Sequence, residues 1–140
     1  MFCIVVKGRR FIFLQKTTVE TGAVPPEFGN NKASVMIIIM HEKDAIYNKR
    51  TKKNVAGTYF GKHEFATLDD LEQKSKYENT DKYRYYFFYE YDGLNPQTNG
   101  YLRKFFVYDR IEDKKYKHPF SAEGWISYQK GYLKGLNDQL

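Results

Sequence analysis

The sequence predicts an α+β fold with a mostly antiparallel sheet of about six to seven strands. Three observations favour this class: short aromatic or β-branched runs bounded by Gly and Pro, a helix-start signal in mid-chain, and an aromatic, glycine-containing helical pattern near the end. A length of 140 residues suits a single domain over 1–140. With 41% hydrophobic residues, the chain has enough apolar surface to form a core.

The first third of the chain predicts three strands and one long loop. Residues 2–6 and 11–16 resemble short strands, and Lys7–Arg10 would form the turn between them. Residues 17–33 lack periodicity and contain several Gly, Pro and Asn residues, which indicates a loop. Residues 35–40 are apolar at every position, as expected for a central strand buried on both faces.

The middle of the chain predicts a second hairpin and then a short helix. Residues 44–49 and 55–60 would form the strands of the hairpin, with a basic tip between them. A helix should begin at Thr67 and end near Lys76, because a capping hydroxyl precedes carboxylates at positions 69 and 70.

An aromatic hairpin is predicted over residues 83–110, which hold 11 of the 24 Tyr and Phe residues. Aromatic residues occupy both faces of its first strand, so one face can fill a core while the other needs a cover. A C-terminal helix from Ser121 would supply that cover, because its aromatic residues recur with helical spacing. A glycine ridge beside this stripe offers an alternative role, as an interface with another chain. The interface candidates are Trp125, Tyr128, Gly131, Tyr132 and Gly135.

The same C-terminal segment, with His118-Pro119-Phe120, Gly124-Trp125 and Lys130-Gly131-Tyr132, resembles the aromatic-glycine helices of ribosome modulation factor and of small phage-encoded proteins. This resemblance covers about 15% of the chain. The rest shows nothing of the all-helical ribosome modulation factor, so ribosome binding is not carried over. The resemblance implies a bacterial or phage setting.

Charge is the main clue to a partner. The chain has a net charge of +6, and residues 1–64 hold 11 Lys or Arg against 5 Asp or Glu, whereas the remainder is balanced. Such asymmetry predicts an anionic partner, either nucleic acid or an acidic protein surface. The predicted phosphate contacts are Lys49, Arg50, Lys52 and Lys53 at the hairpin tip, followed by Arg9 and Arg10.

Catalytic and cofactor signals are weak. Cys3 is the single cysteine, so neither an intrachain disulfide nor a cysteine zinc site is expected. His41, His63 and His118 lack the spacing of a metal pair, and no phosphate loop or serine nucleophile motif occurs. We therefore expect no cofactor, no metal and no catalysis. The longest aliphatic run is far below the ~20 residues of a membrane span, which favours a cytoplasmic location without a membrane partner.

Three hypotheses follow. The first is a small binding protein, for example a phage accessory factor, whose basic half contacts nucleic acid or an acidic surface. The second is a protein-binding inhibitor or homo-oligomeric module that uses the aromatic hairpin and the glycine-ridged helix. The third is a small enzyme that uses one of the three histidines.

Overall fold

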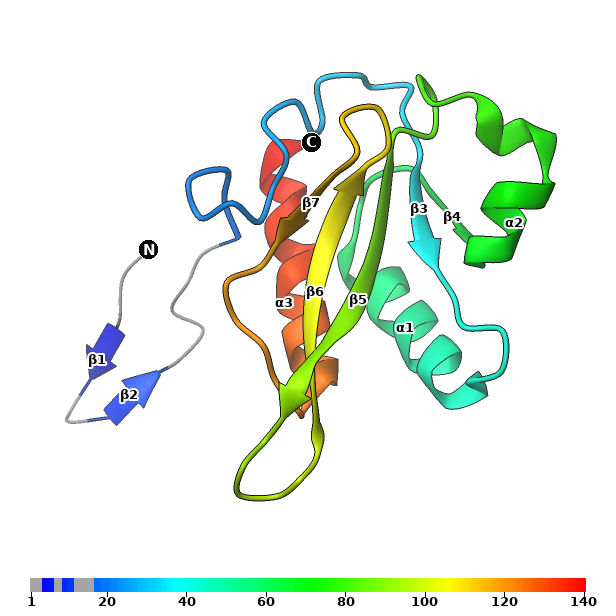
Figure 1. Cartoon of the computed structure of the whole chain (residues 1–140). Coiled ribbons are helices and arrows are strands. Elements are labelled where there is room, and N and C mark those ends of the chain that lie inside the picture. The colour runs from blue at the N-terminus through cyan, green and yellow to red at the C-terminus, as the bar shows by residue number, and fades with distance from the viewer. Residues whose placement is uncertain (1–3, 7–8, 12–16) are drawn as a thin grey trace.

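The computed structural model describes residues 4–6, 9–11 and 17–140, and its centre is a five-stranded mixed sheet (Figure 1). The strands run in the order β4-β3-β5-β6-β7. Strand β3 is parallel to both β4 and β5, while β5, β6 and β7 pair antiparallel. The α+β class is confirmed, but the sheet has fewer strands than predicted and is mixed. The bounds are β3 Met36–Ile39, β4 His63–Ala66, β5 Tyr85–Leu94, β6 Tyr101–Asp109 and β7 Lys114–Lys117.

A separate two-stranded antiparallel sheet lies near the N-terminus. It consists of β1 Ile4–Val6 and β2 Arg9–Phe11. The predicted N-terminal pairing is therefore present, although Arg9 and Arg10 belong to the second strand and not to the turn. Residues 2–3, 7–8 and 12–16 of the predicted hairpin, Cys3 among them, lie outside the described residues.

The prediction of a hairpin over residues 44–60 is wrong, because this segment forms helix α1, Ala45–Thr58. Asp44 caps the helix, since its carboxylate accepts a hydrogen bond of 3.0 Å from the Tyr47 N–H. The helix carries the chain from β3 to β4, and two parallel neighbours need a crossover of about this length. Its buried positions recur every three or four residues but include Thr51, Asn54 and Thr58, so the apolar helical pattern is faint in the sequence.

The helix predicted at Thr67 is confirmed as α2, Leu68–Gln73. The Thr67 hydroxyl accepts from the Asp70 N–H at 3.1 Å, and the Asp70 carboxylate accepts from the Thr67 N–H at 3.0 Å, which completes a capping box. The helix ends at Gln73, before the predicted Lys76, and a 3-10 turn, η1 Ser75–Glu78, follows.

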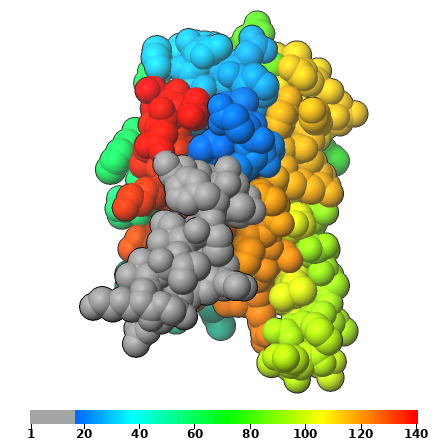
Figure 2. Space-filling model, turned by 90° about the vertical axis from the view of Figure 1, so that its left-hand side faces the viewer, coloured from blue at the N-terminus to red at the C-terminus, as the bar shows by residue number. Residues whose placement is uncertain are grey.

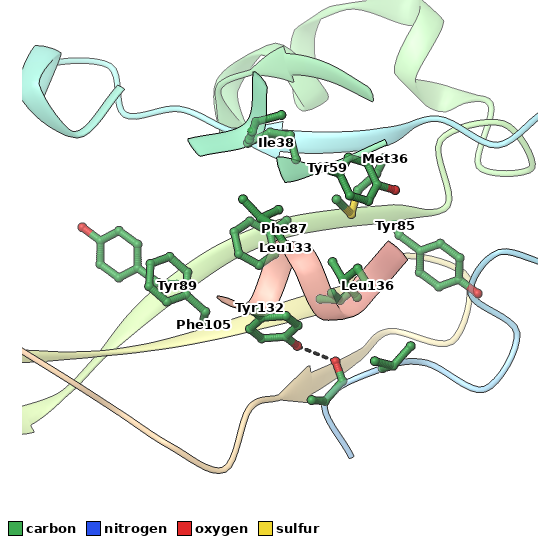
Figure 3. Close-up of a cluster of buried hydrophobic side chains, with 14 of the residues drawn as sticks. Met36, Ile38, Tyr59, Tyr85, Phe87, Tyr89, Phe105, Tyr132, Leu133 and Leu136 are labelled. Carbon is green, nitrogen blue, oxygen red and sulfur yellow. Dashed lines mark hydrogen bonds between the residues drawn. The ribbon is translucent and has the colours of Figure 1, made fainter. Parts of the chain in front are cut away.

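The aromatic hairpin is confirmed as β5 and β6, and helix α3, Trp125–Leu136, packs against it, as does the loop before β3 (Figure 3). Phe87 and Phe105 stack with ring centroids 5.4 Å apart, and Tyr132 meets Phe87 edge-on at 5.3 Å. A short turn, η2 Asn137–Gln139, follows α3. Helices α1 and α3 both cover the face of β5 that is formed by its odd-numbered residues. They do not cover the even-numbered face, for which the sequence predicted the C-terminal helix as a cover.

The even-numbered face of β5 is only partly covered. Tyr86 and Phe88 are half-buried and pack at the edge of a smaller cluster centred on Ile37 and Ile39.

Among the described residues, no helix is long and apolar enough to cross a membrane.

Candidate functional site

Helices α1 and α3 lie side by side and are joined by a buried polar network. The Asn54 side chain donates to the Gln129 side-chain oxygen at 2.9 Å and to the Ile126 carbonyl at 3.0 Å. The Gln129 amide in turn donates to the Thr51 hydroxyl at 3.0 Å and to the Tyr47 hydroxyl at 3.3 Å. Because Gln129 is fully buried, these bonds fix how the two helices sit against each other.

These two helices carry positive charge without any carboxylate. Helix α1 holds four Lys or Arg residues, α3 holds two, and neither contains Asp or Glu. The chain has 23 Lys or Arg, so the 17 outside these helices balance its 17 Asp and Glu. The six positive charges on α1 and α3 therefore equal the entire net charge of +6.

All six cationic side chains are exposed, and none forms an ion pair with a described residue. One of them, Lys52, lies over the Phe65 ring, with Nζ 5.5 Å from its centroid. We call this surface the basic helical face. Its residues are Lys49, Arg50, Lys52, Lys53, Lys130 and Lys134.

Helical periodicity arranges the basic helical face around the junction of α1 and α3. Arg50 is one turn before Asn54, whose amide contacts the Ile126 carbonyl, and Lys130 is one turn after Ile126. Lys53 directly precedes Asn54 and points outward. Cations from two separate segments therefore border one junction, as contacts to a continuous polyanion require.

Exposed apolar residues accompany the cations. Ile46 is 73% exposed, Phe60 is 81% exposed and Ile126 is 38% exposed. Ile46 lies one turn before Arg50 on the outer side of α1, and Phe60 follows the end of this helix. The surface thus combines cations with an accessible aromatic ring.

The predicted basic residues are brought together, but on a helix instead of a hairpin tip. The side chains of Arg9 and Arg10 lie outside the described part of the structure, so the structure does not place them relative to this face. The sequence prediction omitted Lys130 and Lys134. Both lysines lie opposite the aromatic stripe of the C-terminal helix, so the sequence already indicated that they are exposed. Exposed cations on this helix extend a binding surface when a second basic helix lies beside it.

The predicted interface residues mostly contact their own chain. Tyr132 is 1% exposed, and its single hydroxyl proton is shared between the Ala23 and Tyr116 carbonyls, both of which lie within hydrogen-bond distance. Gly135 faces Thr17, in the loop segment that lies between the end of α3 and the later strands in Figure 2. Trp125 and Tyr128 are half-buried against the core. Of the five candidates, Gly131 is exposed, and a side chain there would meet open space.

The three histidines lie in different places. His63 pairs with Met36 at the start of two parallel strands, whereas His41 follows the end of β3, roughly 16 Å further along at 3.3 Å per residue. His41 contacts the Tyr89 hydroxyl at 2.7 Å. His118 is buried beyond β7, and its Nδ1 accepts from the Phe120 N–H at 3.1 Å. The described residues contain no group of three His, Cys, Asp or Glu side chains able to hold a metal ion.

Comparisons with known proteins add little to this geometry. No family model matches the sequence, and no curated protein matches it. A solved structure with partial similarity is a dodecamer of a PelC variant from Paraburkholderia phytofirmans, at 8% identity and a TM-score of 0.43. The match covers 76% of this chain and 89% of that chain.

Proposed function

We propose that this chain is a non-catalytic binding protein that contacts the phosphate backbone of a nucleic acid through its basic helical face. The observation that carries the proposal is that six positive charges, equal to the whole net charge, lie on two adjacent helices without an ion pair to any described residue. Phosphate contacts from Lys and Arg supply most of the sequence-independent affinity for nucleic acids.

The arrangement is costly unless an anion binds. Lys49 and Lys53 are four residues apart on α1, and Arg50 and Lys53 are three apart, so each pair repels at a cost of about 0.2–0.5 kcal/mol. A phosphate backbone along the junction would replace this repulsion with attraction. The exposed Phe60 ring would add base stacking, worth about 1–3 kcal/mol per base in a single strand.

The test measures the binding of fluorescein-labelled single-stranded DNA, duplex DNA and RNA of equal length, by anisotropy, as a function of salt. The informative variant carries Arg50→Gln, Lys53→Gln and Lys130→Gln. The matched control carries Lys114→Gln, Lys115→Gln and Lys117→Gln, which removes the same charge from strand β7. Each phosphate contact contributes about 0.7–0.9 to the slope of log affinity against log salt.

We expect the helical variant to lower this slope by about two to three contacts, and the control to change it by less than one. Equal losses in the two variants would indicate binding by net charge alone and would overturn the proposed site. The absence of salt-dependent binding to all three nucleic acids would overturn the nucleic-acid assignment and leave an acidic protein surface as the partner to test.

A second candidate function is protein–protein contact through the tip of the β5–β6 hairpin, which projects beyond the rest of the sheet (Figure 1). Tyr91, Leu94 and Tyr101 are each at least half exposed there, and the two tyrosine rings contact each other at 4.9 Å. Exposed aromatic clusters are typical of interaction sites. Light scattering should give a mass above 16.7 kDa that falls to this value in Tyr91→Ser/Tyr101→Ser, whereas a monomeric parent chain argues against self-association.

A further inference from the structure

A hollow of about 210 Å³ lies where β3 and β5 begin, away from the basic helical face. Its apolar walls are Phe28, Met36 and Phe60, and two tyrosines, Tyr59 and Tyr85, also line it. A neighbouring hollow of about 310 Å³ shares Tyr85 and part of the loop over residues 29–34. The space would accommodate one aromatic ring with its substituents.

Both tyrosine hydroxyls lack a hydrogen-bond partner among the described residues. The Tyr85 hydroxyl is buried and unpaired, and Tyr85 as a whole is 4% exposed. Tyr59 is 6% exposed, and its hydroxyl has no hydrogen bond to a described residue. Figure 3 shows the two hydroxyls directed toward the same end of the core. A buried polar group without a partner costs about 1–3 kcal/mol, so the fold bears this cost at Tyr85 unless a ligand accepts its hydrogen bond.

The surroundings of the hollow favour an anion. Lys32 and Lys62 line it, both are exposed, and neither forms an ion pair with a described residue. No Asp or Glu lines this hollow, whereas Glu27 and Asp81 line the neighbouring one, where Arg84 pairs with Glu27 at 3.2 Å. Burial raises the pKa of Tyr85 to about 12 and also raises the pKa of Tyr59, so both hydroxyls keep their protons at neutral pH. They are therefore available as hydrogen-bond donors.

We propose that this hollow binds a small aromatic carboxylate. The ring of the ligand packs against Phe28, Met36 and Phe60, its oxygens accept hydrogen bonds from the Tyr59 and Tyr85 hydroxyls, and Lys32 and Lys62 balance its charge. This site uses none of the six cations of the basic helical face, and it shares only Phe60 with the nucleic-acid proposal.

The first test separates a ligand site from a packing defect. Tyr85→Phe removes an unpaired hydroxyl, so the melting temperature of the empty protein should stay unchanged or rise. Tyr132→Phe is the control, because its hydroxyl is bonded to two carbonyls and its loss should lower the melting temperature. A decrease in Tyr85→Phe as large as that in Tyr132→Phe would overturn the premise that the hydroxyl is free.

The second test measures binding by calorimetry and by chemical-shift perturbation, with 4-hydroxybenzoate, benzyl alcohol and inorganic phosphate as probes. We expect saturable binding of 4-hydroxybenzoate, with weaker binding of the neutral alcohol and of phosphate. Tyr85→Phe should weaken it about tenfold, which corresponds to one hydrogen bond of about 1.4 kcal/mol. Lys62→Gln should reduce the preference for the acid over the alcohol.

A third variant, Gly61→Ala, obstructs the hollow but keeps every side chain that would contact the ligand. A Cβ at Gly61 would overlap the Tyr59 hydroxyl, so Gly61→Ala should push this ring and abolish binding of 4-hydroxybenzoate. Equal affinity in the parent chain, Tyr85→Phe and Gly61→Ala would overturn the proposal. So would the absence of saturable binding, or a preference for benzyl alcohol or phosphate over the acid.

Discussion

Cations in the strands β5–β7 and cations on helices α1 and α3 are treated differently by the fold. In and beside the strands, Arg84 pairs with Asp109 at 2.9 Å, and Lys115 and Lys117 pair with Glu90 at 3.0 and 2.9 Å. On the helices, no cation has a carboxylate partner among the described residues. The comparison separates charges that hold segments together from charges without an ion pair to a described residue, and the second kind is the basis of the proposed binding surface.

The Arg84–Asp109 pair shows how far the strand region depends on its charges. Asp109 is 1% exposed and accepts two bonds from Arg84, at 3.0 and 2.9 Å. Burial by itself would raise the pKa of Asp109, but the bonds from Arg84 and from the Glu112 and Ile111 N–H groups outweigh burial and lower this pKa. Removing the arginine would leave a buried carboxylate without its counter-ion.

The largest expected effect is therefore from Arg84→Met. We expect it to lower the free energy of unfolding by about 3–5 kcal/mol, as when one partner of a buried ion pair is removed. The matched variant Lys130→Met should change it by less than about 0.5 kcal/mol, because this lysine is exposed and unpaired. Urea unfolding measures both, and similar losses in the two variants would break the comparison.

The next effect is a pH dependence from His118, beside β7. Burial, helped by the positive charge of Lys104, lowers the pKa of His118 to about 4. In the unfolded chain the pKa is about 6.5, so protonation favours unfolding. Stability should be complete above pH 6.5 and should fall as the pH drops toward 4, by on the order of 3 kcal/mol.

His118→Phe tests this pH dependence. The variant should flatten the stability profile between pH 6.5 and 4, measured by urea unfolding at each pH. Glu90 and Asp109, whose pKa values are lowered, contribute stability that begins to be lost near pH 5, as their unfolded forms, with pKa values of about 4.3 and 3.9, become protonated, so His118 alone governs the profile between pH 6.5 and about 5. An unchanged slope in His118→Phe would mean that other groups produce the loss.

The smallest expected effect is from Glu90→Gln, which leaves Lys115 and Lys117 without their partner. The free energy of unfolding should fall by less than about 1 kcal/mol, since these side chains are partly exposed. The strand region would then carry cations without a carboxylate partner, as the basic helical face does, so affinity for DNA at low salt should rise slightly. A rise larger than the loss in the Arg50, Lys53 and Lys130 variant would place the main binding surface on the sheet.

Local signals in the sequence predicted their elements well. The Thr67 cap, the apolar run before residue 40 and the aromatic hairpin each depend on a few neighbouring residues. Helix α1 was missed because Thr51, Asn54 and Thr58 occupy buried positions that an apolar pattern would require, and its polar partners come from α3. The parallel pairing of β3 depends on that helix, so the mixed sheet could not be predicted either.

The candidate sites were predictable only in part. The cluster Lys49–Lys53 was recognised from composition, but its partner Lys130 becomes a neighbour only through packing. The hydroxyls of Tyr59 and Tyr85, which have no hydrogen-bond partner among the described residues, leave no signature in the sequence, because the lack of a partner depends on how distant segments pack.

The Gln129–Asn54 bond joins residues 75 positions apart. The basic helical face is therefore complete only once the last helix has been synthesised and has packed against α1, because Lys130 and Lys134 come from α3. If the face binds nucleic acid as proposed, full affinity would report completed folding, and a nascent or nicked copy would bind more weakly.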